Sequence, residues 1–165
     1  MPKYLIIDGY NAINKIKCLE AKKDFSLEAS RLSFVKMLMD FMAQKRIFDK
    51  VFIVFDSKER DLGIKRDSYG PVETLFTTID KDADSVIVDM LRAASPKDRI
   101  SVSSDDNFVR NHAKGFGSDV ISIRELEKII MLKKGNLRGK IREKGLREDT
   151  VKGINEELKK HWGLK

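Results

Sequence analysis

Short apolar runs that end in polar or acidic residues alternate with stretches of helical periodicity along residues 1–132. We predict five strands in these runs, at 4–7, 50–56, 72–78, 100–103 and 120–123. Strands that alternate with helices favour a parallel sheet whose two faces are both covered by helices. The chain is therefore predicted to be an α/β protein, a three-layer sandwich with a mainly parallel five-stranded sheet.

Helical periodicity is strongest in the stretch 26–46, which contains no Gly or Pro and places Phe34, Leu38 and Phe41 on one face. Further helices are expected at 84–94, 107–114 and 125–132. The segment that follows Asp8 and the polar residues 57–71 are expected to be loops.

Length and composition exclude several classes of protein. A chain of 165 residues is long enough for one domain with its own core. It has a single cysteine, Cys18, so an intramolecular disulfide is excluded and no zinc-type cysteine spacing exists. No apolar run approaches the roughly 20 residues of a membrane span, and the N-terminus lacks signal-peptide architecture. We therefore expect a soluble, cytoplasmic protein without membrane contact.

Acidic residues stand where the predicted strands end. Asp8 follows the first strand, Asp56 the second, and Asp105 and Asp106 the fourth, while Asp84 lies in the first turn of a predicted helix. In a parallel sheet the carboxyl ends of the strands, and the helices that start there, meet at one edge. These five carboxylates are therefore expected to converge.

A cluster of carboxylates requires a compensating cation, because each negative charge raises the pKa of its neighbours. Carboxylate oxygens with open positions between them suit Mg²⁺ or Mn²⁺. An ion held in this way can activate water for attack on a phosphodiester. The pattern therefore predicts metal-dependent phosphodiester hydrolysis by metal-activated water, without a covalent enzyme intermediate.

Each acid also has a local alternative. Asp56 or Asp106 could be a turn residue or the N-cap of a helix, and Asp84 could complement a helix dipole. Nucleophilic triads are poorly supported, since the histidines are limited to His112 and His161 and lie far from Cys18 in the sequence. The joint pattern of acids is harder to explain by local roles than any single member.

The segment Leu5–Asn11, which reads Leu-Ile-Ile-Asp-Gly-Tyr-Asn, resembles the opening signature of NYN domains, and particularly of the YacP-like group. NYN domains are relatives of PIN-type nucleases. Further matches follow in family order over about residues 4–130, at 54–56, 72–77, 83–84, 102–105 and 121–126. The resemblance implies a PIN-like Rossmannoid fold, endoribonuclease activity that depends on a divalent metal, and association of YacP-like members with translating ribosomes.

The resemblance also assigns site residues. Asp8, Asp56, Asp84 and Asp105 match the acids of the family, and Asn11 matches its signature asparagine, which orients the loop or the substrate. The predicted catalytic residues are these five. The predicted metal ligands are Asp8, Asp84, Asp105 and Asp106.

One departure keeps a second hypothesis open. Many NYN domains carry an acid at the position of Asn107, and Asp106 is the residue that could substitute for it. With an impaired metal site, the chain would be a non-catalytic module that binds RNA or the ribosome.

The positive charge is concentrated at the C-terminal end. The net charge is +7, and residues 133–165 hold 11 Lys and Arg against 5 Asp and Glu. We predict a nuclease domain over 1–132 and a basic C-terminal extension over 133–165, which ends in a helix packed on the domain.

The predicted RNA contacts are Lys65, Arg66, Lys133, Lys134, Arg138, Lys140 and Arg142. The alternative is that the basic segment is only a solvated surface. The expected substrate is single-stranded RNA or mRNA.

Overall fold

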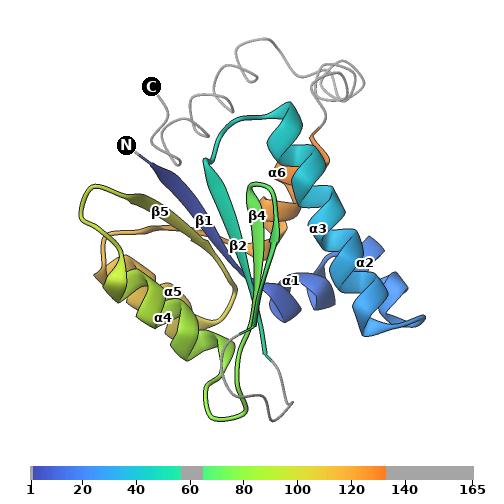
Figure 1. Ribbon diagram of the computed structural model, residues 1–165, viewed down its shortest axis with the longest axis horizontal. Coiled ribbons are helices and arrows are strands. Elements are labelled where there is room, and N and C mark those ends of the chain that lie inside the picture. Colours follow the sequence, from blue (N-terminus) through green and yellow to red (C-terminus); the bar gives the residue numbers. More distant parts are fainter. Residues whose placement is uncertain (1, 57–64, 133–165) are drawn as a thin grey trace.

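A six-stranded sheet lies at the centre of the computed structural model, which describes residues 2–56 and 65–132 (Figure 1). The strands are β1 (Lys3–Asp8), β2 (Lys50–Phe55), β3 (Lys65–Tyr69), β4 (Val72–Phe76), β5 (Arg99–Ser103) and β6 (Asp119–Ile121). Their order is β3-β4-β2-β1-β5-β6. Every neighbouring pair is parallel except β3 and β4. The central strand β1 is therefore flanked by strands from two distant parts of the chain.

The predicted five-stranded sheet gains a strand within the segment that was expected to be a loop. Residues 65–69 form β3, which pairs with β4 through a tight turn at Gly70, whose φ is +63°. The segment Lys-Arg-Asp-Ser-Tyr has no apolar alternation, and charged side chains are common on edge strands because they discourage further pairing. A strand of this composition gives little sequence signal.

Helices cover both faces of the sheet, which confirms the predicted α/β three-layer fold. On one face lie α1 (Gly9–Lys15), α2 (Lys17–Lys23), α3 (Leu27–Gln44) and α6 (Ile123–Met131) (Figure 1). On the other face lie α4 (Ala83–Ala93) and α5 (Asn107–Gly115). The helices α1 and α2 replace the loop that was expected after Asp8.

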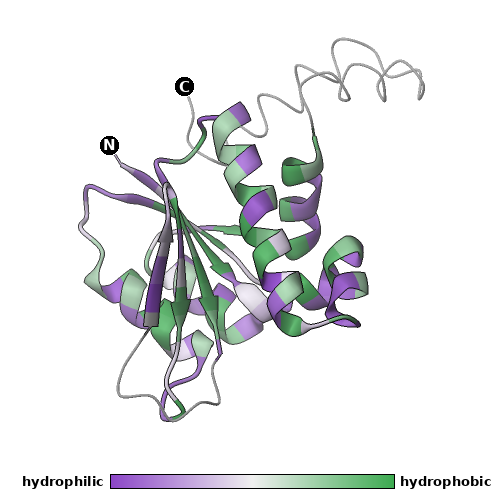
Figure 2. Cartoon of the chain, turned by 45° about the vertical axis from the view of Figure 1, so that its right-hand side comes forward, coloured by the Kyte–Doolittle hydropathy of each residue, from purple (hydrophilic) through white to green (hydrophobic). Residues whose placement is uncertain are grey.

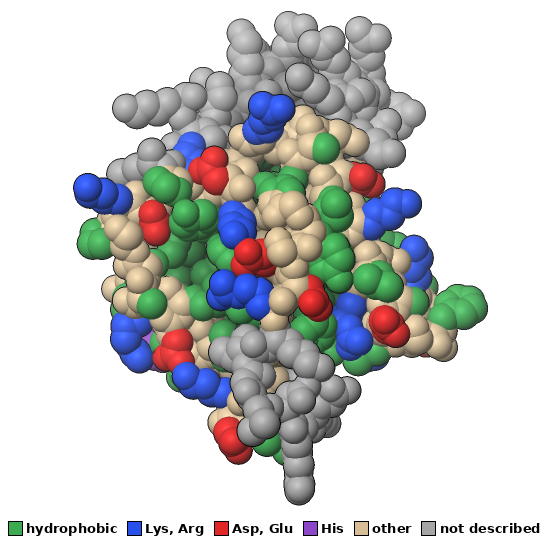
Figure 3. Space-filling view, viewed as in Figure 1, with side chains coloured by type: hydrophobic (Ala, Val, Ile, Leu, Met, Phe, Trp, Pro, Cys, Tyr) green, Lys and Arg blue, Asp and Glu red, His purple; other side chains and the backbone are tan. Residues whose placement is uncertain are grey.

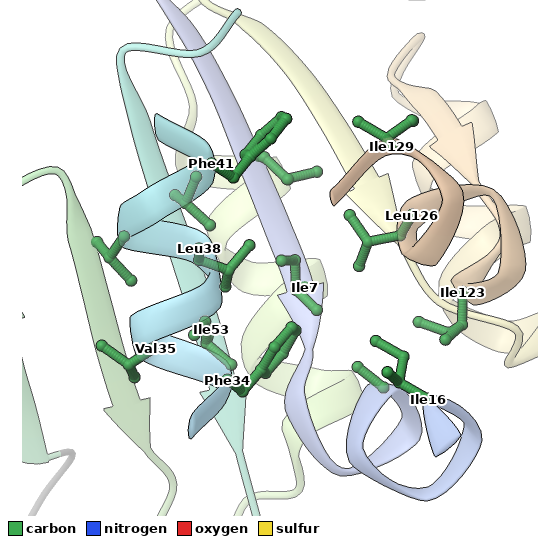
Figure 4. Packing of buried hydrophobic residues seen from close by; sticks show 14 of the residues in the cluster. Ile7, Ile16, Phe34, Val35, Leu38, Phe41, Ile53, Ile123, Leu126 and Ile129 are labelled. Atoms are coloured by element: carbon green, nitrogen blue, oxygen red, sulfur yellow. The ribbon is translucent and has the colours of Figure 1, made fainter. Parts of the chain in front are cut away.

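Two apolar layers fill the space between the sheet and the helices. Figure 4 shows Phe34 and Leu38 of α3 and Leu126 of α6 directed toward Ile7 and Ile53 of the central strands. In Figure 2 the central strands and the inward faces of the helices are mostly hydrophobic. Burial of one such side chain contributes about 2 kcal/mol, so these contacts hold the helices in place on the sheet.

None of the helices within residues 2–56 and 65–132 has the length and apolarity to cross a membrane. The predicted basic extension and its terminal helix, residues 133–165, lie outside the described residues.

Candidate active site

Asp8 is the last residue of β1, and its side chain is only 9% exposed. Burial is the largest cause that raises the pKa of Asp8 to about 6, followed by the charge of Asp84 and, more weakly, that of Asp56. The backbone N–H of Asn11 and the hydroxyl of Ser104 oppose this rise. The Ser104 Oγ donates to Asp8 Oδ2 at 3.4 Å. Asp8 is therefore a buried carboxyl in an acidic environment.

Asp84 lies in the first turn of α4, next to the N-cap residue Asp82, whose Oδ1 accepts a hydrogen bond from Ser85 N at 2.8 Å. Burial raises the pKa of Asp84 to about 6, and the charges of Asp106, Asp82 and Asp56 add to the rise. The helix start thus brings Asp84 to the same edge of the sheet as Asp8.

Asp56 and Asp106 belong to this group and also have local roles. Asp56 follows β2, and its Oδ1 accepts a hydrogen bond from Ala83 N at 2.5 Å, which fixes the start of α4. Asp106 is the N-cap of α5, where its Oδ1 accepts a hydrogen bond from Val109 N at 3.2 Å. We therefore define the acidic group as Asp8, Asp56, Asp84 and Asp106. Asp56 and Asp106 are included because their charges raise the pKa of Asp8 or Asp84, although each also accepts a backbone hydrogen bond at a helix start.

Asp105, in contrast, is occupied by other partners. Its Oδ2 lies 2.6 Å from Lys15 Nζ, and its Oδ1 accepts a hydrogen bond from Ile123 N at 3.0 Å. Burial alone would raise the pKa of Asp105, but the hydrogen bonds from Lys15 and Ile123 and the charges of Lys15 and Arg110 lower it. The structure thus places Asp105 between α1 and α6. The positive charges of Lys15 and Arg110 act to lower its pKa.

Asn11 orients the loop that carries Asp105. Its Oδ1 accepts a hydrogen bond from Asp105 N at 3.2 Å, which connects α1 to the segment after β5. Ser104 fixes the same loop, because its Oγ also accepts a hydrogen bond from Asp106 N at 3.1 Å. Of the two roles that the sequence left open for Asn11, the structure shows the contact to the loop.

Gly9 allows α1 to start directly at the end of β1. A Cβ atom at this position would overlap the ring of Phe55, which is fully buried on β2. The close approach of α1 to β2 places Tyr10 against Phe55, with ring centroids 5.1 Å apart. A glycine after Asp8 is therefore a packing requirement of the site.

The donor set of the acidic group fits Mg²⁺ or Mn²⁺, since all its ligands are carboxylate oxygens. In the described part of the chain, no three acidic, histidine or cysteine side chains are arranged as a ready metal-binding group. Asp56 and Asp106 each use one oxygen in a backbone hydrogen bond. Mg²⁺ commonly binds proteins through one or two carboxylates and retains several waters, so a site for it does not require all four acids.

The predicted RNA contacts are only partly within the described residues. Lys65 begins β3, near the carboxyl end of β4. Arg66 Nε lies 3.8 Å from Glu73 Oε2, and Lys50 Nζ lies 2.7 Å from Glu73 Oε1. Arg66 therefore has a carboxylate partner in the sheet. The other predicted contacts, all between 133 and 142, lie outside the described residues.

Two site residues were missed by the sequence reasoning. Ser104 contacts the acidic group, and Lys15 neutralises Asp105. Ser104 stands directly before the pair of acids that follows β5, and this position was the available signal. The sequence gives no signal for the role of Lys15, because Lys15 and its partner Asp105 lie 90 residues apart.

Comparisons with known proteins identify the family and the fold of the chain. The model of the YacP-like NYN domain family matches residues 5–163. The crystal structure of Rae1 (YacP) from Bacillus subtilis is 24% identical, with a TM-score of 0.66 over 97% of this chain and 92% of that one. The structure of its W164L mutant is 22% identical, with a TM-score of 0.65 over 87% of this chain and 84% of that one. No curated protein matches the chain significantly.

The two crystal structures show that the fold is shared. NYN domains are part of the PIN-like nuclease superfamily, which supports a ribonuclease-type function and RNA as the general class of substrate. The match covers nearly the whole sequence, and the chain therefore belongs to the YacP-like NYN domain family.

Proposed function

We propose that the protein is a metal-dependent endoribonuclease whose catalytic centre contains Asp8 and Asp84. The observation that carries this proposal is the pair of carboxyl groups with pKa values raised to about 6, at the carboxyl edge of a parallel sheet. Uncompensated acids of this kind are common at functional sites, where charge is gathered for a cation or a proton. Membership of a nuclease-related family supports the same conclusion.

Asp8 and Asp84 would hold Mg²⁺ or Mn²⁺, with Asp106 and Asp56 close enough to influence their charge. When bound, such an ion supplies positive charge for the scissile phosphate and lowers the pKa of water. The carboxyl of Asp8 must lose its proton to bind a cation, and with its raised pKa this loss is only half complete near pH 6 in the metal-free protein.

The other residues of the site have positioning roles in this proposal. Ser104 directs its hydroxyl to Asp8, and Asn11 fixes the loop of Asp105 from α1. Asp105, which the sequence reasoning counted among the metal ligands, holds α1 and α6 together through Lys15 and Ile123. Asp56 aligns the first turn of α4, and hence Asp84, through its hydrogen bond to Ala83.

The proposed substrate is single-stranded RNA, with mRNA on a translating ribosome as the setting implied by the family resemblance. The second candidate function is a non-catalytic module that binds RNA or the ribosome. It is favoured by the absence, within residues 2–56 and 65–132, of a ready metal-binding group. Asn107, exposed at the start of α5 where many NYN domains have an acid, points in the same direction.

One experiment separates the two functions. Wild-type protein, Asp8→Asn and the control Asp40→Asn, which changes an exposed acid on α3, are incubated with unpaired RNA and with translating ribosomes. Each incubation is made with Mg²⁺, with Mn²⁺ and with chelator. We expect product from wild type and Asp40→Asn with metal only, and none from Asp8→Asn. Equal product in all incubations would refute the proposal. RNA binding without product in any of them would establish the non-catalytic module.

A further inference from the structure

A cleft with a volume of about 780 Å³ opens beside Asp56, between α3 and the β3–β4 hairpin. Residues from α1, α2, α3, β2, β3 and β4 line it, together with Asp56. Six of its side chains carry the following argument: Tyr10, Arg31, Phe55, Tyr69, Thr74 and Phe76. The cleft thus shares Asp56 with the acidic group, and its other lining residues lie outside that group.

The wall of the cleft is aromatic. The rings of Phe55 and Phe76 stack with centroids 5.4 Å apart and an interplanar angle of 24°. Phe55 is fully buried and supports the wall from behind, whereas Tyr10, Tyr69 and Phe76 are partly exposed. An aromatic wall that is rigid and partly accessible suits a flat, unsaturated ligand.

Arg31 extends this wall with a fixed guanidinium group. Its Cζ lies 5.3 Å from the centroid of the Phe76 ring, and its Nη1 donates a hydrogen bond to Tyr10 Oη at 2.9 Å. No carboxylate among the described residues forms an ion pair with it. A guanidinium group held in this way can donate its free N–H groups to the edge of a base that lies in the plane of the group.

Thr74 provides a polar atom that has no hydrogen-bond partner among the described residues. Its side chain is 3% exposed and lines the cleft, and its Oγ1 has no hydrogen-bond partner among the described residues. Buried hydroxyl groups in native proteins almost always have a partner, because an unpaired one is costly. A ligand in the cleft can supply the missing partner.

The charge of the cleft favours a neutral ligand over a phosphate. Arg31 and Lys23 line it together with Glu28, Asp56 and Asp67, so positive charge does not dominate. On the molecular face in Figure 3, acidic and basic side chains are interspersed and form no extended field of one sign. A polar, planar, uncharged group is the chemistry that such a site recognises.

We propose that this cleft is a subsite for one unpaired nucleobase of the RNA, next to the phosphate that lies at the acidic group. The base stacks against the ring of Tyr69, beside Phe76, and hydrogen-bonds through its edge to Arg31 and to the Thr74 hydroxyl. The identity of the ligand as RNA rests on the proposed function. The recognition of a flat, polar, uncharged group rests on the cleft alone.

The test measures binding with the full chain in chelator, so that the RNA stays intact. The probes are a fluorescently labelled, unpaired ten-nucleotide RNA and a series in which one nucleotide at a time lacks its base. We expect one position at which removal of the base weakens binding by about tenfold or more, as loss of stacking predicts. Equal affinity for every member of the series would overturn the subsite.

Variants then locate the effect. Thr74→Val keeps the size of the side chain and removes the hydroxyl, and Arg31→Met removes the guanidinium. Each should weaken binding of the intact RNA about threefold or more and cause no further loss with the sensitive abasic RNA. The matched control is Ser103→Ala, which removes another buried hydroxyl without a partner, outside the cleft. Losses of equal size on intact and abasic RNA, or an equal loss in Ser103→Ala, would contradict the assignment.

Cleavage of the same RNAs in Mg²⁺ distinguishes failure of the subsite from failure of the proposed function. If RNA is cut but no base position matters for binding, the subsite is wrong and the nuclease proposal stands. If one base position matters but no RNA is cut under any condition, the subsite stands and the nuclease proposal is wrong.

Discussion

Replacement of Asp8 by Asn should make the metal-free protein more stable at neutral pH while it removes the proposed activity. Asp8 is 9% exposed and carries a pKa of about 6 in the folded state, against the ordinary value of 3.8. Between these two pH values the unfolded chain has lost the proton and the folded chain retains it. The free energy of unfolding therefore falls as the pH rises from about 4 to about 6, and it stays lower above that range.

The size of the effect follows from the shift. A difference of about 2 pKa units corresponds to an upper limit of about 3 kcal/mol at pH 8. Asparagine has nearly the same shape and no charge, and its Oδ1 can still accept the hydrogen bond from Ser104. We expect Asp8→Asn to raise the free energy of unfolding by about 1–3 kcal/mol at pH 8 and to change it little at pH 4.

Urea unfolding in chelator at pH 4, 6 and 8 measures this difference, with Asp40→Asn as the control for loss of an exposed negative charge. A second series adds Mg²⁺. Saturation at 100 times the dissociation constant should stabilise wild type by about 2.7 kcal/mol and leave Asp8→Asn nearly unchanged. An Asp8→Asn protein that is less stable than wild type at pH 8, or a difference that does not depend on pH, would refute the reasoning.

Two further predictions concern the support of the site, and a third concerns RNA binding. Gly9→Ala should lower the free energy of unfolding by about 1–3 kcal/mol in urea titrations, because the added Cβ overlaps the buried ring of Phe55; unchanged stability would contradict this packing. Lys15→Met should raise the pKa of Asp105 in an NMR titration, yet change stability by less than about 1 kcal/mol because the ion pair is partly exposed. Replacement of the Lys and Arg residues in 133–147 by Gln should weaken RNA binding and reduce the log–log salt slope by about 0.7 for each lost phosphate contact. An unchanged slope would assign that segment a structural role.

The architecture could be predicted because the buried strands of a parallel sheet are nearly continuous apolar runs. The runs that became β1 and β2 were visible in this way. The helix α1 was not, since it begins at Gly9 and contains two asparagines, residues of low helix propensity. Its stability comes from tertiary contacts of Ala12 and Ile13 with the core, which local sequence does not reveal.

The convergence of the acids was predictable for the same topological reason, since Asp8, Asp56 and Asp84 all follow from the parallel arrangement of the strands. The direction in which each acidic side chain points could not be predicted from the sequence. Asp105 and Asp106 are adjacent after β5, and one faces Lys15 while the other influences Asp84. Which of the two joins the acidic group depends on the path of the backbone after the strand, and that path is fixed by Asn11 and Ser104.

The central position of β1 has a consequence for the folding of the chain during and after its synthesis. Its neighbours β2 and β5 are separated from it by long stretches of chain, and the contact from Ser104 to Asp8 spans 96 residues. Contacts of such separation form late, after the entropy of closing large loops has been overcome. A chain that is still being synthesised, or that has been cut before β5, lacks Ser104 and Asp106, so Asp8 has no hydroxyl partner and the acidic group is missing one of its four members. The acidic group is thus a property of the completed fold, and a partial chain carries no assembled site.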